Sequence, residues 1–279
     1  MLCDLHIHSR HSSGNQSLEE IIGEAQLKGI SLISITDDDT LEAYRVLPEL
    51  AAKMGISYIR GLQVTASLSG SFFRLLAYDF DLENQALPEL LSENQRIWEE
   101  LGEKLIAFLS QFHPELSTKG YRQHQKDPSY GGFKSDSYMA SVGMDGSFEG
   151  GTKRFLQHRE EMMKLFSNLA FQPVEEVIQI IHDARGKLII PGGYLRSMET
   201  YTADVDRLTA LGVDGLEVFS VSYDEQMTKA AHDYAVKHGL LITGGGDDHG
   251  TWANQDKYAI GGRTVKFSEL NLGDIQIYP

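Results

Sequence analysis

This sequence has almost no cysteine, no long apolar run and no excess of positive charge. Cys3 is the single cysteine among 279 residues, so no intrachain disulfide can form and a reducing compartment fits best. No apolar run is long enough to cross a bilayer, and the sequence does not open with a charged-then-apolar leader. We therefore expect a cytoplasmic protein without a membrane partner.

The balance of charge is strongly acidic. The formal net charge of −15 argues against a surface for duplex nucleic acid, because such a surface needs Lys and Arg to displace counterions. It does not exclude a small phosphorylated substrate, since bound cations can reverse the local sign of the field. With 41% hydrophobic and 23% charged residues, the chain can bury a full core.

Expected strands and helices alternate along most of the chain. Short apolar segments such as 31–36, 187–190 and 240–243 are separated by longer segments with helical periodicity. This alternation requires parallel pairing with right-handed crossovers. About seven such strands can be counted, which predicts an α/β fold with a (βα) barrel related to the eight-stranded kind.

Residues 81–171 break this rhythm. A long amphipathic helix is expected over about 87–112, and a Gly-, Ser- and Tyr-rich stretch without clear period follows from about 113 to 151. That stretch is too long for a plain connection. We predict that 81–171 form a helical or irregular insertion that serves as a lid or accessory subdomain, and that 1–80 and 172–279 form the barrel. The apolar stripe of the long helix comprises Leu90, Trp98, Leu101, Leu105 and Phe108.

The first motif is Asp4-Leu-His6-Ile-His8. A strand turns alternate side chains to the same face, so Asp4, His6 and His8 are expected on one side and Cys3 on the other. Two neutral imidazoles side by side suit a divalent metal. The alternative is that both histidines fill hydrogen-bonding positions at the mouth of a barrel.

Adjacent acidic residues follow the next expected strand. Asp39 can cap a helix that begins near Thr40. Asp37 and Asp38 have no such role, and neighbouring carboxylates repel unless a cation or donors lie between them. We interpret this pair as part of a site.

Two later strand ends also carry polar residues. Gln63 follows the strand expected at 56–59, and Asp247 and His249 follow three glycines that let the backbone approach a ligand closely. In (βα) barrels, the C-terminal ends of the strands form the active-site face. This gathering favours the metal interpretation of His6 and His8.

Together these motifs resemble the PHP (polymerase and histidinol phosphatase) family, especially its small metal-dependent phosphoesterases. The resemblance covers most of the chain outside the insertion. It implies a distorted seven-stranded (βα) barrel that holds up to three divalent cations (manganese, zinc or iron) and hydrolyses phosphate esters. The matching segments are Asp4–His8, Ile35–Thr40, Gly61–Gln63, Ile189–Gly192 and Gly245–Gly250.

Several positions depart from the family pattern. Ser13 stands where the family has an Asp or His, and Gln63 stands where it has a bridging Glu. Three further positions at which the family has a His are occupied by Asp38, Arg74 and Ile190. The resemblance therefore implies fewer than three ions. The ligands expected at the cation position that is best retained are His6, His8, Gln63 and Asp247.

The other two cation positions are less complete. The second would share Gln63 and use the positions of Arg74 and Ile190, so it keeps no ligand of the family. The third keeps His249 and has the Asp38 carboxylate in place of a histidine. Asp37 and Glu217 are expected to support the metal ligands from behind.

Two functions stay open. The first is a PHP-type phosphoesterase that hydrolyses a small phosphomonoester or short nucleotide by metal-activated water. In it, Asp38 or His249 moves the proton, and Arg74 binds phosphate through paired hydrogen bonds. The second is a catalytically impaired relative that binds a phosphorylated ligand or a protein partner with one metal or none. In that case Arg74 only pairs with Asp37 or Asp38.

An amidohydrolase-like barrel ranks third. It also opens with His-x-His and closes with an Asp. It would need a lysine or histidines at the ends of the middle strands, and Ile190 and Glu217 do not supply them.

Overall fold

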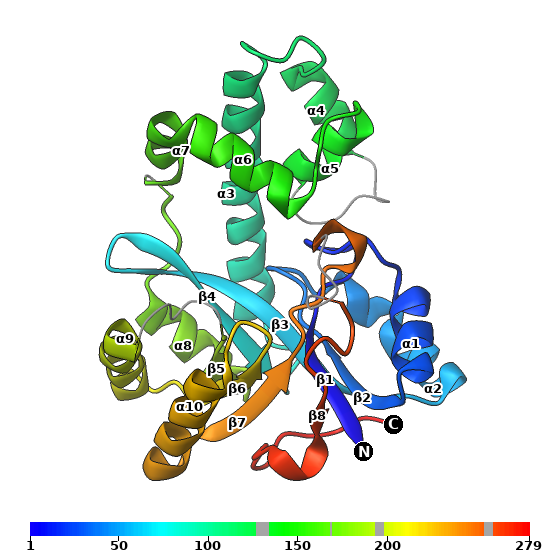
Figure 1. Cartoon of the computed structure of the whole chain (residues 1–279), viewed down its shortest axis with the longest axis vertical. Helices are drawn as coiled ribbons and strands as arrows, with labels where there is room; N and C mark the ends of the chain where they lie inside the picture. Colours follow the sequence, from blue (N-terminus) through cyan, green and yellow to red (C-terminus); the bar gives the residue numbers. More distant parts are fainter. Residues whose placement is uncertain (127–133, 168, 193–197, 254–258) are drawn as a thin grey trace.

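The computed structural model describes residues 1–126, 134–167, 169–192, 198–253 and 259–279. Its strands form one eight-stranded sheet in the order β7-β6-β5-β4-β3-β2-β1-β8, which curls into a barrel (Figure 1). This arrangement confirms the predicted α/β barrel. The strands are β1 (Leu2–Ile7), β2 (Ile30–Ile35), β3 (Ser57–Leu68), β4 (Ser71–Tyr78), β5 (Lys187–Ile190), β6 (Gly215–Ser220), β7 (Leu241–Gly245) and β8 (Val265–Lys266).

The barrel nearly closes where β7 returns to β1. The His8 amide donates to the Asp248 carbonyl at 2.8 Å, and the Asp248 amide donates to the His6 carbonyl at 3.2 Å. A Cβ atom at Gly245 would lie 2.4 Å from the His6 amide nitrogen. The absence of a side chain at Gly245 therefore lets β7 approach β1, and the expected approach of the three glycines to a ligand stays a prediction.

Strands β3 and β4 form an antiparallel hairpin, so the parallel pairing expected throughout the barrel does not hold for this pair. Residue 63 does not end a strand, since β3 continues to Leu68 and pairs Gln63 with Leu76. Ser69 and Gly70 both have positive φ (54° and 80°), which suits a two-residue hairpin turn. Because β4 runs back from this turn, its early residue Arg74 lies toward the end of the barrel where β1 and β2 terminate.

Helices cover the outside of the barrel. Ser17 accepts a hydrogen bond from the Glu20 amide, and the Glu20 carboxylate accepts one from the Ser17 amide, so a capping box begins α1. The covering helices are α1 (Leu18–Leu27), α2 (Leu47–Met54), α8 (Val174–Asp183), α9 (Met198–Ala210) and α10 (Glu225–His238). Short 3-10 turns are η1 (Glu42–Arg45), η2 (Gly250–Ala253) and η4 (Phe267–Glu269).

Two apolar clusters lie on the two faces of the sheet. The larger one packs the strands against the helices. The smaller one contains only strand residues and the C-terminal segment, so it fills the barrel interior. Its buried members are Cys3, Leu5, Leu32, Ile59, Leu76, Tyr78, Ile189, Leu272 and Ile275.

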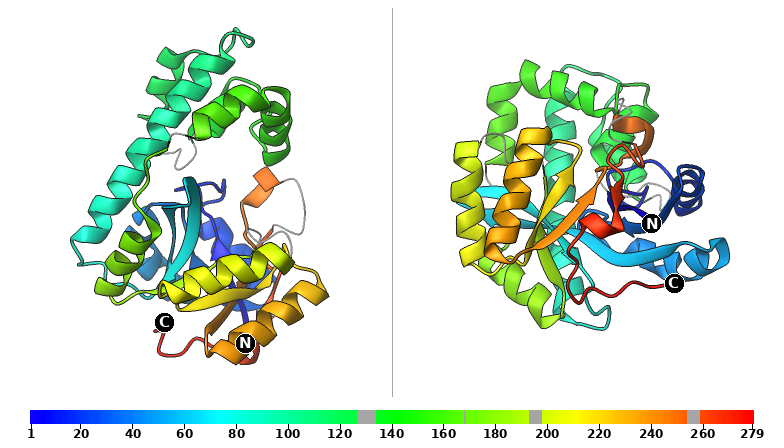
Figure 2. Two further views of the ribbon diagram at one scale, coloured as in Figure 1. Left: turned by 90° about the vertical axis from the view of Figure 1, so that its left-hand side faces the viewer. Right: turned by 60° about the horizontal axis from the view of Figure 1, so that its bottom comes forward.

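A helical part projects beyond the end of the barrel at which β1 and β2 terminate (Figures 1 and 2). Leu87, Leu90 and Leu91 at the start of its first helix pack on the barrel core, whereas Ile106 and Leu109 near its end belong to a separate cluster. The helices are α3 (Ala86–Leu109), α4 (Thr118–His124), α5 (Lys134–Ser141), α6 (Phe148–Gln157) and α7 (Arg159–Phe166).

The stretch without clear period is more regular than expected. It contains α4, α5 and the start of α6, and Ser117 and Ser147 cap the first and last of these. The helices are short and carry few apolar residues, which explains why periodicity did not reveal them. The domain boundaries stay a prediction. In the part of the chain that the structure describes, no helix combines the length and apolarity needed to span a membrane.

Candidate metal centre

His6 and His8 lie at the mouth of the barrel, but Asp4 does not join them. The register between β1 and β2 shifts between Asp4 and Ile7, and this irregularity breaks the alternation of side chains. The Asp4 carboxylate instead accepts hydrogen bonds from the Gly246 and Gly261 amides, both at 2.9 Å, and burial raises its pKa to about 6. The prediction that Asp4 shares their face is wrong.

Three imidazole rings converge on one oxygen of Asp247. The distances to Asp247 Oδ1 are 3.2 Å from His6 Nε2, 3.4 Å from His8 Nε2 and 3.2 Å from His249 Nε2. The ligand atoms of His6, His8 and Asp247 all lie within 4.8 Å of one another. His8 Nε2 is buried and makes no hydrogen bond within the described residues. A cation would give this nitrogen a partner.

The electrostatics of the cluster also suit a cation. Burial lowers the pKa of His6, but the Glu217 and Asp247 carboxylates outweigh it and raise that pKa to about 9. Burial raises the pKa of Asp247, yet His6 and His249 hold it well below its usual range. Two imidazole nitrogens and one carboxylate oxygen are donors that zinc, manganese and iron accept. His6, His8 and Asp247 therefore fit a divalent cation.

Glu217 and Gln63 surround the His6 ring. Glu217 Oε1 lies 2.8 Å from His6 Nδ1, and Glu217 Oε2 accepts a hydrogen bond from the Gly192 amide at 2.7 Å. This contact orients the ring with Nε2 toward Asp247, as carboxylates behind metal-binding histidines do. Gln63 Nε2 lies 3.1 Å from His6 Nε2. If the side-chain amide of Gln63 rotated by half a turn, its neutral oxygen would face the cluster of imidazoles in place of its nitrogen.

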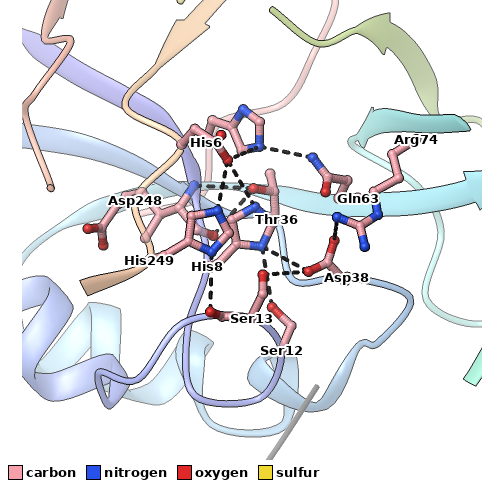
Figure 3. Close-up of polar contacts among 12 residues, drawn as sticks. His6, His8, Ser12, Ser13, Thr36, Asp38, Gln63, Arg74, Asp248 and His249 are labelled. Carbon is pink, nitrogen blue, oxygen red and sulfur yellow. Dashed lines mark hydrogen bonds and ion pairs between the residues drawn. The ribbon is translucent and has the colours of Figure 1, made fainter. Parts of the chain in front are cut away.

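His249 belongs to the cluster through its stacking on His8. The two rings are nearly parallel, with centroids 4.3 Å apart and planes inclined by 7° (Figure 3). His249 Nδ1 lies 3.2 Å from the Ser13 carbonyl oxygen, to which it can donate. Its Nε2 lies 3.2 Å from Asp247 Oδ1, so the ring lies between a carbonyl oxygen and a carboxylate oxygen.

Asp37 lies behind the cluster. Its carboxylate accepts hydrogen bonds from the amide and hydroxyl of Ser9, both at 2.7 Å, and from the Ser12 hydroxyl at 2.6 Å. Ser12 Oγ also lies 3.3 Å from His8 Nδ1. Asp37 thus holds the loop that follows β1 and supports His8 from behind.

Asp38 joins the histidine cluster to Arg74. Its Oδ1 lies 3.4 Å from Arg74 Nη1, and its Oδ2 lies 3.6 Å from His8 Nδ1 and accepts from Ser13 Oγ at 2.5 Å (Figure 3). Burial raises the pKa of Asp38, but Arg74 and His8 outweigh burial and lower it. Ile190 is buried in the cluster between strands and helices, so it offers no ligand.

Asp39 does not cap a helix, contrary to the prediction. Its φ of 48° is left-handed, and its buried carboxylate lies between β3 and α3. It accepts hydrogen bonds from the Thr65 amide (2.8 Å), Thr65 Oγ1 (2.6 Å), Asn94 Nδ2 (2.8 Å) and Trp98 Nε1 (2.9 Å). The spacing of Asn94 and Trp98, one turn apart on an amphipathic helix, is the signal that could have revealed this role.

Barrels with a cluster of imidazoles and carboxylates at the C-terminal ends of their strands are typical of metal-dependent hydrolases. A model of the PHP domain matches residues 4–184, well over half of this chain. The chain therefore belongs to the PHP-domain family, and the family predicted from its motifs is confirmed.

Two relatives and one solved structure illustrate the similarity. A 5'-3' exoribonuclease of Haemophilus influenzae is 21% identical over 252 residues, which are 88% of this chain and 89% of that protein. A 3',5'-nucleoside bisphosphate phosphatase of Chromobacterium violaceum is 24% identical over 251 residues, 88% of this chain and 86% of that one. A crystal structure of a candidate metal-dependent phosphoesterase from Bifidobacterium adolescentis has a TM-score of 0.79 at 20% identity, covering 96% and 93% of the two chains.

Proposed function

We propose that this protein is a metal-dependent phosphoesterase that hydrolyses a small phosphomonoester or short nucleotide. The observation that carries the proposal is the convergence of His6, His8 and His249 on Asp247, beside the half-buried guanidinium of Arg74. Imidazole and carboxylate ligands serve the cation, and the guanidinium matches the oxygens of a phosphate group. The names of the two relatives, which both act on phosphate esters of nucleotides or RNA, support the same class of reaction.

In this proposal His6, His8 and Asp247 hold the cation, with Gln63 as a further neutral donor. The chemistry that such a cation supplies is activation of water and neutralisation of charge at the phosphate. Arg74, held by Asp38, binds phosphate oxygens through its N–H groups.

His249 is the proton carrier that the geometry favours. Its Nε2 faces the cluster while its Nδ1 is held by the Ser13 carbonyl. Asp38 is the second candidate, but its lowered pKa makes it a weak proton donor at neutral pH. The Asp38 carboxylate would therefore accept a proton rather than donate one.

The alternative is a non-catalytic relative that binds a phosphorylated ligand or a protein partner. The Arg74–Asp38 ion pair and the buried Ile190 favour it, because they leave no ligands for a second cation position. Both functions use the same phosphate-binding groups. Turnover therefore separates them.

The test is release of inorganic phosphate from p-nitrophenyl phosphate and from nucleoside 3',5'-bisphosphates with added manganese, zinc or iron. We expect metal-dependent turnover that His8→Ala lowers by at least about a hundredfold, the upper end of what loss of an outer partner of a metal ligand costs. Turnover that persists in His8→Ala would be due to another enzyme in the preparation. Binding of metal and phosphate without turnover on any of these substrates would favour the non-catalytic alternative.

A further inference from the structure

Helix α3 is tied to the metal centre through Asp39. Two side chains of the helix, Asn94 and Trp98, donate to the Asp39 carboxylate, and Gln95 Nε2 donates to its carbonyl oxygen at 2.9 Å. The residue before Asp39 is Asp38, whose carboxylate pairs with Arg74. Helix α3 is therefore hydrogen-bonded to the residue that directly follows Asp38.

The indole ring of Trp98 is fixed on several sides and lies against Arg74. Phe72 meets it edge-on with centroids 5.4 Å apart, and Phe171 lies 5.0 Å away. Its Nε1 donates to Asp39. Arg74 Cζ lies 5.3 Å from the centre of the ring, within the range of a cation–π contact. The guanidinium thus lies between the Asp38 carboxylate and this ring.

The same residues are linked through the β3–β4 hairpin. Thr65 is the residue directly opposite Arg74 in the register of the two strands. Its amide and hydroxyl both donate to Asp39, the carboxylate that also holds Trp98. The strand position of Arg74 and the position of the indole are therefore set by one buried group.

We infer that Trp98 is a positioning residue that holds the Arg74 guanidinium in the orientation in which it binds a phosphate group. This inference rests on the proposed function of Arg74. An arginine has a long side chain, and ordering it on binding costs entropy that a preorganised guanidinium does not lose. Contact with a ring face restrains the guanidinium without using its N–H donors, which phosphate needs.

The experiment measures the affinity of the metal-loaded protein for inorganic phosphate by calorimetry. Arg74→Ala tests the proposed function itself. Trp98→Leu, which removes the ring and the N–H group, is expected to weaken phosphate binding about three- to thirtyfold, the range that a cation–π contact supports. Trp98→Phe keeps a ring and is expected to lose less. The double variant Arg74→Ala/Trp98→Leu is expected to bind no more weakly than Arg74→Ala alone.

Leu90→Ala is the matched control, because Leu90 packs α3 on the barrel core and its side chain has neither a ring nor a hydrogen-bonding group to offer Arg74. It is expected to lower the unfolding temperature and leave phosphate affinity unchanged. Equal weakening by Leu90→Ala and Trp98→Leu, or additive losses in the double variant, would overturn the positioning role alone. Phosphate binding that Arg74→Ala does not weaken, or no binding by the wild type, would overturn the phosphate-binding function of Arg74 and the inference with it.

Discussion

Gln63 and Arg74 are the residues from which we infer how many cations this site would hold. A second cation beside the first needs a bridging negative charge, and Gln63 offers a neutral amide at that position. The fixed positive charge of Arg74 lies at the Asp38 carboxylate, on the side where further ligands would be needed. Two unit charges 4 Å apart near a protein surface repel by about 4 kcal/mol. One cation with an arginine beside it is the arrangement that these residues support.

The Cys3 thiol is expected to be unreactive in the folded protein at pH values near its ordinary pKa. The thiol is buried in the barrel interior, and burial raises its pKa to about 11. Thiolate is the reactive form, so the native thiol is expected to react very slowly with Ellman's reagent at pH 8. In denaturant, one thiol per chain should react at once, because an unfolded cysteine has a pKa of about 8.5. Prompt reaction of the native protein at pH 8 would show that the thiol is accessible.

The site residues differ in how well sequence reasoning could place them. His6, His8, Asp247 and His249 were predictable because each lies near the end of an apolar strand segment or shortly after it. The role of Asp39 was not predictable in the same way. An Asp before a helical segment is the usual pattern of a cap, and its real partners on α3 lie more than fifty residues away in sequence.

Among the elements, β7 carries a glycine, Gly245, at a position without room for a side chain. A methyl group at Gly245 would meet the His6 amide nitrogen at 2.4 Å and the His6 Cβ at 2.6 Å. Gly245→Ala is therefore expected to lower the free energy of unfolding by about 1–3 kcal/mol, as overpacking does. It should also weaken metal binding, because it displaces His6.

Gly23→Ala is the control for that variant. Gly23 lies inside α1, where an added Cβ would meet nothing within 4 Å. Alanine in a helix interior is more favourable than glycine by about 0.5–1 kcal/mol, so this variant should gain stability in denaturant titrations. A Gly245→Ala protein as stable as the wild type would show that β7 and β1 do not approach as closely as described.

Some strands and helices could be predicted from the sequence more easily than others, for a physical reason. The parallel strands β2, β5, β6 and β7 are apolar and follow helices, so their existence follows from pattern alone. The continuation of β3 beyond Gln63 follows from its pairing with β4 across a Ser-Gly turn. A Ser-Gly pair alone is only a weak sequence signal for such a hairpin. Helices α4 to α6 are held by capping serines and one small cluster, which leave little periodic signal.

At the scale of the whole molecule, the C-terminal segment closes the barrel at the end opposite the site. Leu272 and Ile275 belong to the interior cluster, and Tyr278 stacks on Tyr58 of β3. This cluster supports β1 from inside, so the segment stabilises the strand that leads into His6 and His8.

Ile275→Ala is expected to lower the free energy of unfolding by about 2–4 kcal/mol, because it leaves a cavity in the interior cluster. Leu27→Ala is its control, since Leu27 is 90% exposed and its loss should change stability by less than about 0.5 kcal/mol. Chemical denaturation of both variants checks the pair. Equal stabilities would mean that the C-terminal segment does not contribute to the core.

The proposed metal centre is tested most directly by elemental analysis of protein purified without chelator, which measures the moles of manganese, iron and zinc per chain. We expect close to one equivalent of metal, lost in His6→Ala, because His6, His8 and Asp247 form one candidate ligand set and the positive charge of Arg74 disfavours a second cation beside it. No metal after incubation with excess manganese or zinc would contradict the metal centre. Two or more equivalents that depend on His6 would contradict the role given to Gln63 and Arg74.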